Sequence, residues 1–216
     1  MLKDLKLGFK LLRYGYKIKM NIVIVAIFLA IAIIVEYTSQ GENVIGGFYL
    51  MLIGMFVYQM VISTDISAFV ASSPMQRKLQ VNIPVITSTA AYLLLYTVLL
   101  IERVFMIKAF PEREYELINS LIMILIMLFV ANIYCAICFK YYAIGFILLF
   151  VFSFFVGFTF GVNGIDMFMV NLPLSIVGII GYGVIFAGAG VQYAIGSLLY
   201  RKPLSEFAFR GIFKDM

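Results

Sequence analysis

Six apolar runs fill most of this 216-residue chain, and each is long enough to cross a lipid bilayer as a helix. The hydrocarbon core of a bilayer is about 30 Å thick, so roughly 20 apolar residues span it as a helix. Hydrophobic residues make up 64% of the chain and charged residues 12%, which excludes an ordinary soluble domain. The sequence therefore predicts an all-α polytopic membrane protein with a single transmembrane domain. Its six spans are predicted at residues 20–38, 44–63, 83–107, 117–139, 141–162 and 172–199.

Lysine and arginine residues are distributed unevenly between the two sides of this arrangement. An even number of spans puts both termini on one side, and positive residues gather on the cytoplasmic side of membrane proteins. With the N-terminus inside, all of the 16 cationic residues except Arg103, Lys108 and Arg113 lie on the inner side. We therefore expect both termini to be cytoplasmic. The net charge of +5 reflects this topology and requires no nucleic-acid partner.

Residues 1–19 predict an amphipathic helix in the inner membrane interface. Such a helix places its cations against anionic lipid head groups and its apolar row in the acyl boundary. The alternative is an ordinary positively charged flank of the first span. Gly8 and Gly15 each disfavour a helix by about 1 kcal/mol relative to alanine. The apolar row is Leu2, Leu5, Phe9, Leu12 and Tyr16, and the cationic row is Lys3, Lys6, Lys10, Arg13 and Lys17.

Motifs for catalysis and for metal or nucleotide binding are missing from the chain. Histidine is absent, which removes the commonest metal ligand and general base. Cys135 and Cys138 form a C-x-x-C inside a predicted span, and we interpret them as buried small residues. No phosphate-binding loop of the G-x-x-x-x-G-K-[ST] type occurs, so ATP would have to be bound by another chain. The sequence predicts neither an enzyme nor a cofactor site.

Two further segments on the outer side call for interpretation. Glu36, Glu102 and Arg103 lie near the outer ends of spans one and three. One interpretation is an ion pair between Glu36 and Arg103, and the other, which we favour, is interface charges that reach water by snorkelling. Residues 163–172 are polar enough to interrupt the membrane pattern yet too apolar for a free loop, which predicts a short outer re-entrant segment.

The insert at residues 64–82, between spans two and three, is the one inner segment with the character of a docking element. Thr64 or Asp65 is a suitable cap for one short helix, and Ser73-Pro74 is a typical start of another. This predicts a compact knob at the inner face, with an apolar ridge followed by a positive end. The alternative is an amphipathic connector that rests on the membrane. Ile66, Phe69 and Val70 form the ridge, and Arg77 and Lys78 form the positive end.

The order of these features resembles the type-2 ABC-transporter permeases, and within them the short bacterial permeases of phenol-soluble-modulin and antimicrobial-peptide exporters. The resemblance is carried by Asp65 and by Ser73-Pro74-Met75-Gln76-Arg77-Lys78, which stand where that family has a leucine/serine-proline-x-x-arginine-lysine pattern. It implies a subunit of the bacterial cytoplasmic membrane that dimerises, with itself or with a sister permease. Two partner ATPase subunits would hold ATP and Mg²⁺. The coupling contacts with the ATPase would come from Asp65, Ile66, Phe69, Val70, Ser73, Pro74, Arg77 and Lys78.

The resemblance makes an export permease for an amphipathic peptide or another lipophilic compound the leading hypothesis. The main alternative is the vitamin-binding membrane subunit of an energy-coupling-factor importer, which also has six spans. Ala26 and Ala30 supply a small-residue pair of the kind that importer would need, but such pairs are frequent in any transmembrane helix. A third hypothesis is a membrane scaffold or assembly factor without transport activity.

Overall fold

Helices form every regular element in the part of the chain that the structure describes. The computed structural model describes residues 2–15, 18–41, 44–65, 70, 72–138, 140, 141, 147, 151 and 172–202. Five helices are long and apolar enough to cross a membrane. They agree with five of the six predicted spans, while the predicted span 141–162 and the segment 163–172 lie outside the described residues or nearly so. The five are α2 (Ile18–Ser39), α3 (Val44–Asp65), α5 (Ile83–Ala109), α6 (Glu114–Cys138) and α8 (Leu174–Leu199).

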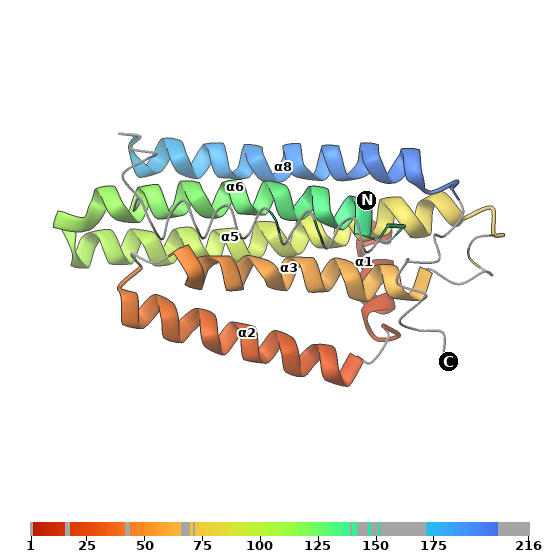
Figure 1. Ribbon diagram of the computed structural model, residues 1–216, viewed down its shortest axis with the longest axis horizontal. Helices are drawn as coiled ribbons and strands as arrows, with labels where there is room; N and C mark the ends of the chain where they lie inside the picture. Colours follow the sequence, from red (N-terminus) through yellow and green to blue (C-terminus); the bar gives the residue numbers. More distant parts are fainter. Residues whose placement is uncertain are drawn as a thin grey trace.

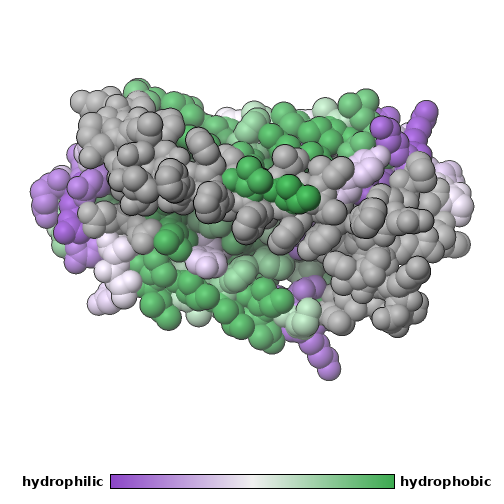
Figure 2. All heavy atoms as spheres, viewed as in Figure 1, coloured by the Kyte–Doolittle hydropathy of each residue, from purple (hydrophilic) through white to green (hydrophobic). Residues whose placement is uncertain are grey.

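The long helices lie side by side along one axis, with α2 at the edge of the group (Figure 1). The short helix α1 (Leu2–Leu12) runs across this axis at the end of the bundle where α2 begins. On the face shown in Figure 2, apolar residues cover the middle of the described surface and hydrophilic residues gather at both ends of the long axis. An apolar belt between two polar ends is the surface that a membrane-embedded protein presents.

Tight connections join the long helices at the end opposite α1. Gln40 and Gly41 between α2 and α3 both have left-handed backbones, with φ of 52° and 78°. Glycine adopts this conformation without the steric penalty that a side chain brings. A single 3₁₀ turn, η2 (Pro111–Arg113), connects α5 to α6. These short connections make α2 and α3, and α5 and α6, antiparallel pairs.

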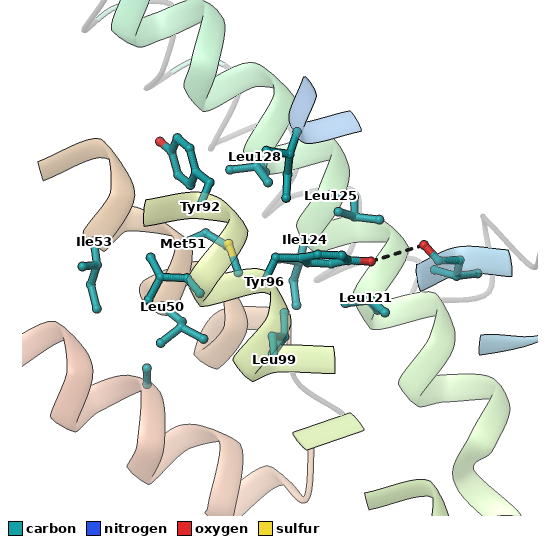
Figure 3. Packing of buried hydrophobic residues seen from close by; sticks show 14 of the residues in the cluster. Leu50, Met51, Ile53, Tyr92, Tyr96, Leu99, Leu121, Ile124, Leu125 and Leu128 are labelled. Carbon is teal, nitrogen blue, oxygen red and sulfur yellow. Dashed lines mark hydrogen bonds between the residues drawn. The ribbon is translucent and has the colours of Figure 1, made fainter. Parts of the chain in front are cut away.

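A cluster of large apolar side chains fills the space between α3, α5, α6 and α8 (Figure 3). Tyr96 of α5 is fully buried there, and its hydroxyl donates a hydrogen bond of 3.2 Å to the carbonyl of Val177 in α8. A bilayer supplies no hydrophobic driving force between helices, so close packing and interhelical hydrogen bonds hold them together. Glycines allow that approach: the Cα of Gly181 faces the Tyr96 ring, and that of Gly188 faces Asn132.

The direction of α8 follows from contacts at its two ends. Its beginning lies beside Tyr96, in the half of α5 that leads to the η2 turn. Beyond its other end, the Tyr200 carbonyl accepts a 3.0 Å hydrogen bond from Gln76, and the Lys202 carbonyl accepts one of 2.7 Å from Lys140. The helix α8 is therefore parallel to α6 and antiparallel to α5. The ends of α6 and α8 thus meet at the same end of the bundle as α1.

Candidate functional site

The helix α1 packs against the bundle through a face that contains glycine. Gly8 is buried against Thr87 of α5, with no room for a Cβ atom between them. A hydrogen-bonded ion pair of 2.7 Å joins Asp4 to Lys78. The two exposed apolar residues Leu2 and Phe9 lie on the far side of the helix. The same glycine that disfavours an isolated helix therefore makes the docking of α1 possible.

The cationic row of α1 is arranged as predicted, over a shorter helix. The helix covers Leu2–Leu12 rather than residues 1–19. The exposed cations lie between the packed face and the exposed apolar residues, and Lys17 lies outside the described residues. The location of this helix in the membrane interface stays a prediction. The exposed members of the row are Lys3, Lys6, Lys10 and Arg13.

The first half of the predicted knob differs from the expectation. Thr64 and Asp65 belong to the last turn of α3, so the prediction that one of them caps a new helix is wrong. Both residue types fit a helix start when the sequence is considered locally, but α3 continues past them. Ile66 and Phe69 lie outside the described residues. Val70 is buried, with 9% of its surface exposed.

Ser73-Pro74 does form a turn that leads into a helix, as its sequence predicts. The backbone N–H of Met75 donates to Ser73 Oγ at 3.1 Å, and the N–H of Gln76 donates to the Ser73 carbonyl at 3.0 Å. Helical turns then continue through a π-helix, η1 (Lys78–Asn82), directly into α5. The second predicted helix of the knob is therefore the beginning of the third span, which extends over Lys78–Ala109 as one continuous helix.

Three consecutive side chains of the insert contact other helices. Gln76 donates to the Tyr200 carbonyl beyond α8. The Arg77 guanidinium donates to the Tyr193 hydroxyl at 3.0 Å and lies 5.8 Å from the centre of its ring, which adds a cation–π contact. Lys78 pairs with Asp4 of α1. Arg77 and Lys78 are therefore engaged within the chain, whereas the sequence suggested a free positive end.

Residues on the tip of the insert remain accessible. Ser72, Pro74 and Met75 are exposed, and 46% of the Met75 surface is open. Ser73 is half-buried because its hydroxyl and carbonyl face the turn. The tip therefore offers a small, mostly uncharged contact surface immediately ahead of the residues that hold α1 and α8.

The ionisable groups at this end of the bundle respond to their neighbours. The hydrogen bond from Lys78 is the main cause that lowers the pKa of Asp4 below its ordinary value. The Asp4 contribution to the docking of α1 is therefore fully present above the usual pKa of an aspartate and is lost as the pH falls through the lowered value. Burial lowers the pKa of Lys140, whose ammonium donates to the Lys202 carbonyl at 2.7 Å.

A second ionic cluster lies at the opposite end, where the sequence suggested snorkelling interface charges. Arg103 is fully buried and donates to the Gly41 carbonyl at 2.6 Å and to Glu36 Oε1 at 3.2 Å. Its Nε lies 3.6 Å from Glu102 Oε2. The snorkelling interpretation is therefore wrong for Arg103, and the ion pair with Glu36 is present. The guanidinium fixes the α2–α3 turn to α5.

Some of these contacts left a signal in the sequence and others did not. Asp4 is the one acidic residue among the cations of the first 19 positions, which marks it as a partner for a lysine or arginine. Tyr193 has no such mark, because α8 carries no charge and its aromatic residues look alike in sequence. Nothing local to Gly8 predicts that it packs on Thr87. No protein-family model, curated protein or solved structure matches the chain.

Proposed function

We propose that this protein is the transmembrane permease subunit of an ATP-driven ABC exporter in a bacterial cytoplasmic membrane. It moves an amphipathic peptide or another lipophilic compound out of the cell. ATP and Mg²⁺ are bound by partner ATPase subunits, and a second permease copy or a sister permease completes the transporter. The chain itself is not an enzyme and supplies the path and the coupling contacts.

The observation that carries this proposal is that the insert is connected to three helices at once. It continues directly into α5, it holds the end of α8 through Gln76 and Arg77, and it holds α1 through Lys78. A partner that displaces the exposed Met75 therefore pulls on all three. Differential contacts between the partner and two arrangements of these helices are what would shift the equilibrium between them.

The π-helix at the base of the insert adds to this argument. The residues Lys78–Asn82 follow a π-helical path and then change to an α-helical one at Ile83. Isolated π-helical turns are rare and occur frequently at functional sites. Here the turn lies between the exposed tip and the span, where a change of helical register would be transmitted along α5.

Six spans with both ends in the cytoplasm are part of the same proposal. Because α6 and α8 are parallel, the chain has to return along the bundle between Cys138 and Leu174, and the apolar run 141–162 is long enough to cross a bilayer. The cationic residues of α1, Arg77, Lys78 and Lys140 gather at one end. This is the asymmetry of a cytoplasmic side.

Site-specific cross-linking tests the coupling contact. Met75→Cys places a thiol at the exposed tip, while the native Cys135 and Cys138 are buried. A photoactivatable thiol reagent attached there, followed by purification of the full chain, should yield a covalent adduct with a soluble subunit that contains an ATP-binding motif. Glu112→Cys is the matched control, since Glu112 is equally exposed but lies at the other end of the bundle.

The expected result is an ATPase adduct from the Met75→Cys variant and none from the Glu112→Cys variant. The proposal fails if no ATP-binding polypeptide is joined to either variant, or if both variants give the same partners. Recovery of the adduct should also fall when the cells are depleted of the identified ATPase, which confirms that the mass-spectrometric assignment is correct.

A further inference from the structure

Three polar side chains from three helices meet inside the apolar part of the bundle. They are Tyr58 of α3, Tyr92 of α5 and Gln192 of α8, with 2%, 1% and 1% of their surfaces exposed. The Tyr58 hydroxyl lies beside the Gln192 side chain, and Tyr92 lies beside Tyr58 and Cys135. Figure 3 shows the Tyr92 hydroxyl pointing away from the neighbouring Leu128. We call these three side chains the polar cluster.

Most atoms that can hydrogen-bond in the polar cluster lack a partner among the described residues. Neither the Nε2 nor the Oε1 atom of Gln192 makes a hydrogen bond of acceptable geometry, and the Tyr92 hydroxyl makes none. Other buried polar side chains of the same helices are satisfied. Asn132 donates to the Leu128 carbonyl at 2.9 Å, and Tyr96 donates to the Val177 carbonyl at 3.2 Å.

An unsatisfied amide is especially unfavourable at this position. The interior of a membrane protein offers no bulk water, so each polar atom needs a partner inside the protein or from a bound molecule. Polar groups at this depth usually mark a binding site or a path. A leucine in place of Gln192 would pack without this penalty, so the retained amide indicates a partner that binds there.

We propose that the polar cluster binds a neutral hydrogen-bonding ligand, which is water in the resting protein and an amide group of the cargo during export. The second half of this statement rests on the proposed export function. Gln192 presents one donor group and one acceptor, and each tyrosine hydroxyl can do both, which matches water or a peptide amide. A charged ligand fits poorly because the surrounding parts of α3, α6 and α8 contain no charged residue.

The native cysteines provide a reporter of this ligand. Cys135 lies beside Tyr92, and Cys138 is one turn further along α6. Both are buried, so their S–H groups exchange with deuterium only when water reaches them. Exchange of the purified full chain in D₂O can be followed by the shift of the S–H stretching band in the infrared spectrum, without any ATPase partner.

Gln192→Met removes the amide at nearly constant volume and should slow thiol exchange by about tenfold. Gln80→Met is the matched control, because Gln80 is also buried but accepts a 3.3 Å hydrogen bond from Gln76. Tyr92→Phe removes one hydroxyl, keeps the ring and should also slow exchange, which keeps the test valid if Gln192→Met fails to fold. Equal exchange in the wild type, Gln192→Met and Tyr92→Phe would overturn the inference.

A neutral amphipathic peptide with blocked ends separates the two ligands. If the cargo amide occupies the cluster, the peptide slows thiol exchange in the wild type but not in Gln192→Met. If the peptide changes neither rate, the amide half is overturned while the water half stands on the comparison above. Both readouts use the isolated chain, so the absence of an ATPase partner in the cross-linking experiment would not affect them.

Discussion

Arg103→Met is expected to destabilise the folded protein by about 3–5 kcal/mol, the usual effect of removing one partner from a buried ion pair. Arg103 is fully buried and holds both the Glu36 carboxylate and the Gly41 carbonyl. Methionine fills a similar volume but leaves Glu36 charged or forces it to take up a proton, and it leaves the carbonyl with the Ser120 hydroxyl alone. Unfolding of the purified protein by heat or denaturing detergent measures the loss.

Two further variants make this prediction specific to the ion pair. Lys108→Met removes an exposed cation from the last turn of the same helix, and we expect an effect below about 0.5 kcal/mol. Adding Glu36→Gln to Arg103→Met should recover part of the loss, because no uncompensated carboxylate then remains at that position. If Arg103→Met unfolds at the same point as Lys108→Met, the buried cluster does not hold this end of the bundle together.

Gly181→Val is expected to destabilise the packing of α8 on α5 by about 1–3 kcal/mol, the usual range for overpacking a well-filled core. A Cβ atom at Gly181 would enter the space occupied by the Tyr96 ring and hydroxyl. Tyr96 has little freedom to move, since it is fully buried, bonds the Val177 carbonyl and packs edge-on against Tyr182 at 5.1 Å. The same unfolding assay reports the change.

Gly183→Val provides an internal control two residues away. A Cβ atom there meets nothing within 4 Å, so its effect should be close to zero. The double variant Gly181→Val/Tyr96→Phe should recover part of the loss, because the phenylalanine lacks the hydroxyl nearest to the new side chain. Equal effects of Gly181→Val and Gly183→Val would contradict the packing of α8 described here.

The lengths and positions of the membrane helices were predictable because the property that defines them is local. The apolar run 20–38 corresponds to α2 and the run 44–63 to α3, each within about two residues. A bilayer requires a minimum apolar length, and hydrophobic composition reports that length directly. The same reasoning explains why α5, α6 and α8 lie where the sequence placed them.

Interactions between helices were much less predictable, because they depend on which faces meet. Arg103 had the sequence signature of a snorkelling residue, but its helical position turns it toward the α2–α3 turn and a free carbonyl. Lys78 and Arg77 looked like a free positive end until α1 and α8 brought Asp4 and Tyr193 to them. Helical propensity at Thr64 was equally ambiguous, since the same residue types occur at both helix ends.

The central claim of this account is that the insert and the cationic end of the bundle face the cytoplasm. The most direct measurement is labelling of Met75→Cys and Glu112→Cys variants on intact cells with a membrane-impermeant maleimide. Both positions are exposed, and both native cysteines are buried. The account predicts that Glu112→Cys is labelled on intact cells and that Met75→Cys is labelled only after the membrane is permeabilised. Labelling of Met75→Cys on intact cells would contradict it, because an insert outside the cell cannot contact a cytoplasmic ATPase.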